Sequence, residues 1–279
     1  MTEGRVLKGV EFARAGDRSG RPLLLDLYLP AAQKPLRPAV VHFHGGGWRM
    51  GERSSLGPVC DGFGLNPFEV LVEAGFVVVS ADYRLSSEAH FPAQLNDALA
   101  AVEWLRNHAD EYGVDPARIY AWGDSAGGHL ASLVGLTGEH HSSVAAVAAW
   151  YPPTDLASMA EQALPTAVSR PSDPGSREEL LIGAVLAEEP GKAAAASPIN
   201  YVHPGAPPFL LVHGTADRFV PAAQSETLAD RLTDSGADVE LLLIEDADHM
   251  WSLPDGSAAA AGKALAATVS FFRRQSGLS

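Results

Sequence analysis

The chain has 279 residues and a single cysteine, Cys60. One thiol cannot form an intrachain disulfide, and it lacks the companion ligands that a structural zinc site needs. No run of eighteen consecutive apolar residues occurs, which argues against a membrane-spanning helix. Basic residues are scarce: 20 Lys and Arg against 34 Asp and Glu give 20 − 34 = −14 at pH 7. A surface this acidic repels phosphate backbones, so neither nucleic acid nor membrane is an expected partner.

Hydrophobic residues make up 46% of the chain, which excludes a disordered protein. The length is sufficient for one large core, and we expect a single α/β domain over residues 1–279. Residues 1–5 (MTEGR) lack the apolar core of a signal peptide, and we interpret them as a cytoplasmic start. The sequence leaves the oligomeric state open between monomer and homodimer.

Short β-rich runs alternate with longer stretches of helical periodicity. Near-continuous apolar runs are typical of strands covered on both faces, and this alternation predicts a mostly parallel sheet with helices on both faces. The expected strands are 23–29, 39–43, 76–81, 119–122, 144–150, 209–212 and 239–244, and the expected helices are about 92–111, 128–134, 222–235 and 257–274.

Residues 155–197 interrupt this alternation. They are rich in Ala, Ser, Pro and Glu and contain no strand pattern. We expect a small helical insertion between two strands that acts as a lid, with a loose surface excursion as the alternative.

The pentapeptide 123–127 (GDSAG) directly follows a predicted strand and precedes a helix-compatible stretch. By itself the G-x-S-x-G pattern is weak, but a strand before it and a helix after it are typical of a nucleophile elbow. Such a turn holds the serine, here Ser125, in a strained backbone conformation with Oγ exposed. A Cβ on either flanking glycine would collide with the neighbouring strand and helix. The pattern therefore predicts a nucleophilic serine.

A nucleophilic serine needs a base and an acid that orients the base. In elbow folds the chain order is Ser, then Asp or Glu, then His. Asp217 directly follows the strand 209–212, and His249 is the one histidine beyond it. We therefore predict Ser125, Asp217 and His249 as the catalytic residues. Asp155 and Asp248 are the competing candidates for the acid.

Three consecutive glycines follow the strand 39–43, within residues 44–48 (HGGGW). Bare backbone so close to a core strand indicates a ligand approaching the N–H groups, which together with the N–H of Ala126 would form an oxyanion hole. His42 and His44 share one strand face and could suggest a metal pair, but no third ligand has suitable spacing. We therefore expect no metal and no organic cofactor.

The chain resembles an α/β-hydrolase esterase of the hormone-sensitive-lipase and bacterial feruloyl-esterase-like group. The resemblance covers roughly residues 22–275 and depends on 44–48 (HGGGW), 81–85 (ADYRL), 123–128 (GDSAGG), 213–217 (HGTAD) and His249. It implies an eight-stranded, mostly parallel sheet with a small lid, and an activity toward carboxylic esters.

The resemblance also implies roles for individual residues. Gly46, Gly47 and Ala126 correspond to the family's oxyanion-hole donors, and Asp217 and His249 to its acid and base. The segment 82–85 (DYRL) corresponds to a structural signature that supports the oxyanion loop.

Two features depart from the family pattern. After His249 the chain has Met and Trp, where the family has Gly or Ala and then an aromatic residue. Residues 1–21 are also too short for a large helical cap.

We expect Trp48, Phe219 and Trp251 to stand at the mouth of the site, where rigid aromatics favour short acyl or aromatic esters. A kynurenine-formamidase-like amide hydrolase and a natural-product tailoring hydrolase or thioesterase remain the alternatives.

Overall fold

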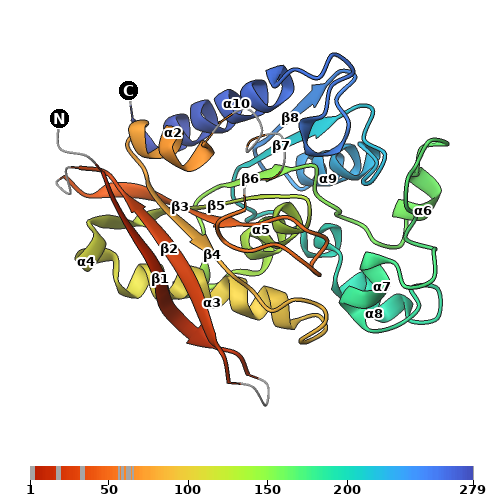
Figure 1. Cartoon of the computed structure of the whole chain (residues 1–279), viewed down its shortest axis with the longest axis horizontal. Coiled ribbons are helices and arrows are strands. Elements are labelled where there is room, and N and C mark those ends of the chain that lie inside the picture. The colour runs from red at the N-terminus through yellow and green to blue at the C-terminus, as the bar shows by residue number, and fades with distance from the viewer. Residues whose placement is uncertain are drawn as a thin grey trace.

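The computed structural model describes residues 4–16, 20–31, 35–55, 57, 60, 64 and 66–278. Residues 1–3, part of the predicted cytoplasmic start, lie outside the described residues. Within the described chain, one eight-stranded sheet has the order β1-β2-β4-β3-β5-β6-β7-β8 (Figure 1). The strands are β1 (Arg5–Arg14), β2 (Pro22–Leu29), β3 (Arg37–Phe43), β4 (Val77–Ala81), β5 (Val114–Asp124), β6 (Val147–Trp150), β7 (Phe209–Gly214) and β8 (Val239–Ile244).

Strand direction divides the sheet into two parts. From β4 through β3 to β8 all neighbours run parallel, whereas β2 pairs antiparallel with both β1 and β4. The parallel strands β3, β4 and β7 are apolar and almost wholly buried, as a sheet covered on both faces requires. The predicted α/β class with a mostly parallel eight-stranded sheet is confirmed.

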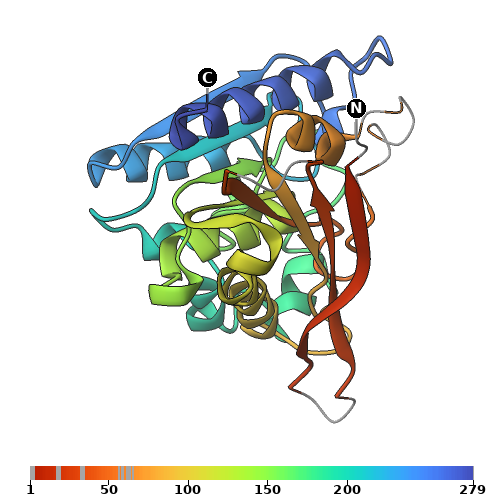
Figure 2. The same cartoon turned by 90° about the vertical axis from the view of Figure 1, so that its left-hand side faces the viewer.

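Helices cover both faces of the sheet (Figures 1 and 2). Alternate residues of each strand enter opposite cores, so Val41 packs in the core beneath α3, α5 and α9, whereas Val40 packs in the core beneath α2 and α10. The helices are α2 (Pro67–Glu73), α3 (Ala93–Asn107), α4 (Ala109–Tyr112), α5 (Ala126–Thr137), α6 (Met159–Gln162), α7 (Arg177–Ile182), α8 (Pro190–Ala195), α9 (Ala223–Asp234) and α10 (Ala259–Ser276), with 3₁₀ turns η1 (His140–Ser142), η2 (Pro198–Tyr201) and η3 (His249–Trp251).

The eighth strand, β1, is one that the sequence patterns did not predict. It is mostly exposed, it forms the edge of the sheet, and its pairing with β2 shifts register twice. The N–H of Gly9, which has φ +68°, donates to the carboxylate of Asp26 at one of these irregularities.

Between β6 and β7 the chain leaves the sheet, in the region of the predicted insertion. The segment carries three short helices, α6, α7 and α8, at one end of the molecule (Figure 1). Its function as a lid stays a prediction.

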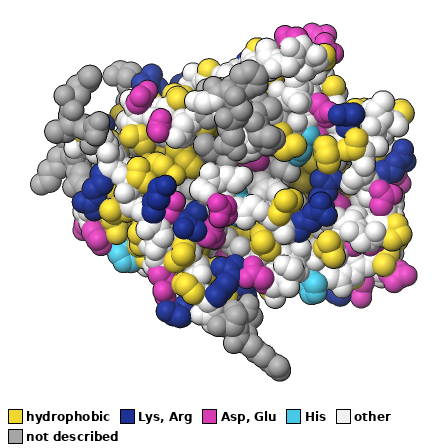
Figure 3. Space-filling model, viewed as in Figure 1, with side chains coloured by type: hydrophobic (Ala, Val, Ile, Leu, Met, Phe, Trp, Pro, Cys, Tyr) yellow, Lys and Arg dark blue, Asp and Glu magenta, His cyan; other side chains and the backbone are white. Residues whose placement is uncertain are grey.

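On the face shown in Figure 3, acidic and basic side chains are interspersed, and neither sign forms a continuous patch over the described residues. None of the helices in the described ranges combines the length and the apolar character needed to cross a membrane.

The contact between α5 and β6 allows a packing prediction. A Cβ on Gly135 would lie 2.4 Å from Cγ2 of Val147, a stiff β-branched side chain on the sheet. An alanine normally stabilises a helix by about 0.5–1 kcal/mol relative to glycine, but overpacking costs about 1–3 kcal/mol. We expect Gly135→Ala to lower the free energy of unfolding by about 1–2 kcal/mol in urea titrations.

Gly262 on α10 is the matched control, because a Cβ there meets no atom within 4 Å. We expect Gly262→Ala to raise the free energy of unfolding by about 0.5–1 kcal/mol. Equal effects of the two variants would contradict the packing argument.

Candidate active site

Ser125 lies at a sharp turn between the end of β5 and the start of α5. Its backbone has φ 52° and ψ −118°, a region that residues with a Cβ rarely adopt. A Cβ on Gly123 would lie 2.3 Å from the backbone of Gly127, and a Cβ on Gly127 would lie 1.9 Å from the carbonyl oxygen of Phe43. The strained turn and the need for both flanking glycines therefore agree with the prediction.

Three side chains from separate loops form a hydrogen-bonded row. Nδ1 of His249 lies 2.7 Å from Oδ2 of Asp217, and Nε2 lies 3.1 Å from Oγ of Ser125. Because an ionised carboxylate only accepts, Nδ1–H donates to Asp217 and the lone pair on Nε2 faces the serine hydroxyl. The structure thus brings together the three residues that the sequence nominated.

Asp217 is 1% exposed and is held by several donors. Oδ1 accepts from the N–H groups of Phe219 and Val220, both at 2.8 Å. Burial alone would raise the pKa of Asp217, but the charge of His249 and hydrogen bonding by His213 and His249 hold that pKa well below its usual range. The carboxylate is therefore ionised whenever the protein is folded at ordinary pH.

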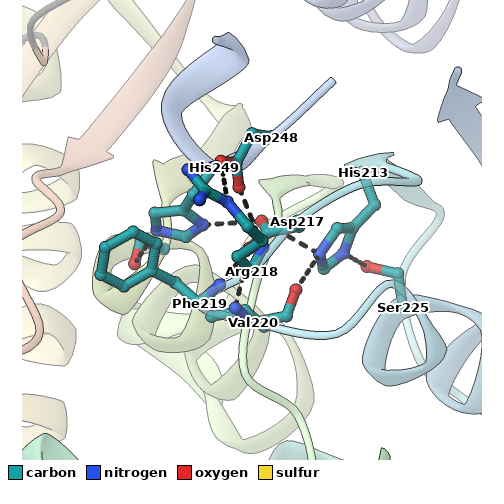
Figure 4. Close-up of polar contacts among 9 residues, drawn as sticks. His213, Asp217, Arg218, Phe219, Val220, Ser225, Asp248 and His249 are labelled. Carbon is teal, nitrogen blue, oxygen red and sulfur yellow. Dashed lines mark hydrogen bonds and ion pairs between the residues drawn. The ribbon is translucent and has the colours of Figure 1, made fainter. Parts of the chain in front are cut away.

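His213 is a neighbour of Asp217 to which the sequence assigned no role. Its Nε2 lies 3.5 Å from Oδ2 of Asp217 and 2.9 Å from the carbonyl oxygen of Val220, while Nδ1 lies 2.7 Å from Oγ of Ser225. Figure 4 shows Asp217 between the two histidine rings. His213 and Asp217 are four residues apart across the turn after β7, a spacing that could have suggested the contact.

The two competing acids are engaged elsewhere. Asp248 pairs with the side chain of Arg218 and accepts from the backbone N–H of His249 (Figure 4). The carboxylate of Asp155 accepts from the N–H of Ala157. Neither carboxylate reaches the His249 ring, so the geometry favours Asp217.

The glycine loop after β3 presents backbone donors beside Ser125. Gly46 and Gly47 have φ +115° and +61°. Within the described chain, neither of their N–H groups donates to a backbone carbonyl or a side chain. Ala126 is the first residue of α5, where a helix leaves its N–H unpaired. The three donors predicted from the sequence are thus available.

Three hydrogen bonds hold the glycine loop in place. The N–H of Gly45 donates to Asp124 at 3.0 Å, and the Tyr83 hydroxyl donates to the carbonyl oxygen of His44 at 2.8 Å. The N–H of Ser86 donates to the carbonyl oxygen of Trp48 at 2.7 Å. Segment 82–85 and its neighbour therefore support this loop, in agreement with the resemblance.

The expectation that Trp48 and Trp251 stand at the mouth of the site is wrong, since both are 1% exposed. A positive φ at each residue, +56° and +66°, turns its side chain into the protein. The Trp48 indole donates to Nδ1 of His129 at 3.1 Å, and Trp251 packs edge-on against Trp150 and Tyr151.

The side chains that do border the histidine are Phe219 and Tyr151. Their ring centroids lie 5.2 Å and 4.6 Å from that of His249. Arg177, from the insertion, places its guanidinium carbon 5.1 Å from the centroid of the Phe219 ring. Sequence reasoning named Phe219 but missed the other two; Tyr151 could have been found from its position directly after β6.

The two histidines at the end of β3, His42 within the strand and His44 just after it, serve the fold. Nδ1 of His42 lies 2.9 Å from Oγ of Ser80, and Nδ1 of His44 donates to the carbonyl oxygen of Gly45 at 2.7 Å. Among the residues that the structure describes, no group of three or more potential ligands is arranged to hold a metal ion.

A sheet of this order, with a strained serine after β5, an acid after β7 and a histidine after β8, defines the protein as an α/β-hydrolase. The sequence model of the BD-FAE family matches residues 25–232. The chain therefore belongs to the BD-FAE family.

Comparisons with individual proteins agree with this family assignment. The esterase LipQ of Mycobacterium tuberculosis is 32% identical over 251 residues, which are 84% of this chain and 55% of LipQ. A truncated carbohydrate esterase from gut microbiota has a TM-score of 0.81 at 29% identity, covering 99% of this chain and 98% of that one. Propionate-bound esterase Est2 of Thermogutta terrifontis has a TM-score of 0.73 at 29% identity, covering 98% and 94%. The chain thus spans little more than half the length of LipQ.

His129 provides a pH-dependent prediction. It is fully buried on α5, accepts from Trp48, and donates from Nε2 to the carbonyl oxygen of Ala196 at 2.6 Å. Burial lowers its pKa from 6.5 to about 4. Between those values the unfolded chain binds a proton that the folded protein does not, so stability falls as the pH drops from about 6.5 to 4.

We expect His129 to remove roughly 2–3 kcal/mol of unfolding free energy between pH 7 and pH 4.5. His129→Gln cannot titrate and should show a correspondingly flatter pH profile, measured by urea unfolding at several pH values. Parallel profiles of the wild type and the variant would contradict this assignment.

Proposed function

We propose that this protein is a serine carboxylesterase that acts on short-acyl or aromatic carboxylic esters. The observation that carries the proposal is the row from Asp217 through His249 to Ser125, with the serine in a strained turn beside unpaired backbone donors. The relatives named as esterases support the same reaction class.

In the first half of the reaction, Oγ of Ser125 attacks the ester carbonyl while Nε2 of His249 takes the hydroxyl proton. Asp217 holds the imidazole in the tautomer that leaves Nε2 free, and its low pKa keeps it ionised. The N–H groups of Gly46, Gly47 and Ala126 stabilise the tetrahedral oxyanion, each contributing about 3–4 kcal/mol in comparable sites.

In the second half, His249 gives its proton to the leaving alcohol, and the acyl group stays on Ser125. A water molecule then attacks the acyl-enzyme, with His249 again taking the proton. The bond between Oγ of Ser125 and the acyl carbon breaks, His249 returns the proton to Oγ, and the carboxylic acid leaves. None of these steps requires a metal ion or an organic cofactor, so we propose cofactor-free catalysis.

The preference for a compact substrate has a different origin from the one expected from sequence. Trp48 and Trp251 are buried, whereas the Phe219 ring lies beside that of His249 and the Arg177 guanidinium lies over the Phe219 ring. We infer that these two side chains narrow the site. Est2 was solved with propionate, a three-carbon acid, which agrees with a short acyl group here. The cytoplasmic location and the monomer-or-homodimer state stay predictions.

Substitutions in the row test the mechanism. Ser125→Ala and His249→Ala should each lower kcat by about 10⁴–10⁶, with the double variant no worse, because the residues act as a unit. Asp217→Asn should lose about 10⁴ through the wrong tautomer. Steady-state kinetics with a 4-nitrophenyl ester measures each value. Asp155→Asn is the control; an inactive Asp155→Asn beside an active Asp217→Asn would reverse the assignment of the acid.

A substrate panel tests the acyl preference. We expect kcat/KM for 4-nitrophenyl esters to peak between two and four acyl carbons and to fall steeply by twelve, because the narrow site excludes a long chain. An optimum at twelve carbons or more would refute the short-acyl proposal. N-formylkynurenine, assayed in parallel, tests the formamidase alternative, which a value a hundredfold above every ester would establish.

A further inference from the structure

Arg177 begins α7 in the insertion, yet its side chain lies against the site itself. A Cβ on Gly47 would be 2.5 Å from Cδ of Arg177, so the aliphatic part of the arginine rests on the backbone of an oxyanion-loop glycine. Its guanidinium lies over the ring of Phe219, which in turn borders His249. Arg177 therefore spans the gap between the oxyanion loop and the loop that carries the acid.

The guanidinium of Arg177 is only partly engaged. One terminal nitrogen donates to Oγ of Ser169 at 2.9 Å, and no carboxylate lies within ion-pair distance of it among the described residues. An arginine has five N–H donors in a planar fork that matches a carboxylate. Most of these donors thus make no hydrogen bond to a described residue.

The described acidic side chains near Arg177 do not pair with its guanidinium, so the guanidinium can bind another anion. Glu178, the next residue, is 2% exposed, and its Oε2 has no hydrogen-bond partner. Burial raises the pKa of Glu178, and the opposing charges of Arg177 and Arg49 do not offset this increase. Glu179 accepts from the N–H of Gly175, and Asp217 is already matched by His249.

The net charge of the whole chain disfavours anions. Its formal charge is −14, and the face shown in Figure 3 has no continuous basic patch over the described residues. An anionic substrate would therefore depend on a local cation, and Arg177 contacts Gly47 and Phe219, which border the site.

We propose that the ester substrate carries a carboxylate, in its acyl or its alcohol part, which Arg177 binds while the ester carbonyl lies at Ser125. This inference rests on the proposed esterase function and names the substrate class within it. Arg177 acts here as a specificity residue, since it takes no proton and forms no covalent bond.

Two pairs of probes test the proposal, each matched in size and different in charge. For the acyl part, mono-4-nitrophenyl glutarate is compared with the 4-nitrophenyl ester of glutaramic acid. For the alcohol part, 4-acetoxybenzoate is compared with 4-acetoxybenzamide. A charge-assisted hydrogen bond at a partly exposed site contributes at the lower end of its usual range, so we expect kcat/KM to favour the anionic member of one pair about tenfold.

Arg177→Gln should remove this preference by raising KM for the anionic ester about tenfold more than KM for its neutral partner. Arg177→Lys should retain part of the preference, because it keeps the charge but loses the planar fork. Arg170→Gln, at an exposed arginine of the same insertion, is the matched control and should leave the preference intact.

Three outcomes would overturn the proposal: no anionic preference in either pair, an equal loss for both members in Arg177→Gln, or the same loss in Arg170→Gln. The second result would indicate that Arg177 only supports the oxyanion loop.

Binding to Ser125→Ala, measured by calorimetry with the four esters, separates this inference from the proposed function. If the wild type hydrolyses no ester, the function fails. If Ser125→Ala binds an anionic ester more tightly than its neutral partner, and Ser125→Ala/Arg177→Gln does not, the carboxylate site is still upheld. If Ser125→Ala shows no such preference, the carboxylate site is refuted.

Discussion

The close approach of α5 to β3 and β5 is the constraint on which the site depends. The backbones of Gly123, Gly127 and Phe43 come so near that no Cβ fits at either glycine. This contact leaves Ser125 at φ 52°, which points its side chain away from the sheet and toward the loops at the carboxyl ends of the strands. The parallel sheet then delivers Asp217 and His249 to the same edge, because β7 and β8 end there. The packing of the central sheet therefore maintains the strained backbone conformation of Ser125.

The glycine loop depends on the same helix. Trp48 ends the glycine run and donates to His129, one turn into α5, while the other nitrogen of His129 donates to Ala196 at the end of the insertion. Both ring nitrogens are used, one as acceptor and one as donor, so the ring must be neutral for both bonds to exist. One buried imidazole thus links the glycine loop, the nucleophile helix and the insertion, which explains why Trp48 lies inside the protein instead of at the mouth of the site.

The features that the sequence predicted correctly depend on local patterns, and the features that it missed depend on the surrounding structure. Ser125 and the glycine loop belong to short motifs next to buried strands, and such local patterns are read from neighbouring residues alone. The edge strand β1 was missed because its two faces are both largely exposed and its register shifts, so it has no apolar alternation. The orientation of Trp48 and Trp251 depends on the sign of φ in a loop, which residue type does not determine for a non-glycine residue.

Arg177 is the clearest example of a residue that sequence patterns do not predict. Its contact with Gly47 joins residues 130 positions apart, and no motif marks it. Ser125, Asp217 and His249 follow strands, and the sheet places them; Arg177 comes from the insertion, whose short helices are placed by side-chain packing. The insertion is also anchored at its far end by the bond from His129 to Ala196. A substitution near α7 therefore leaves the elbow in place, because the contacts that strain Ser125 lie within the sheet and α5.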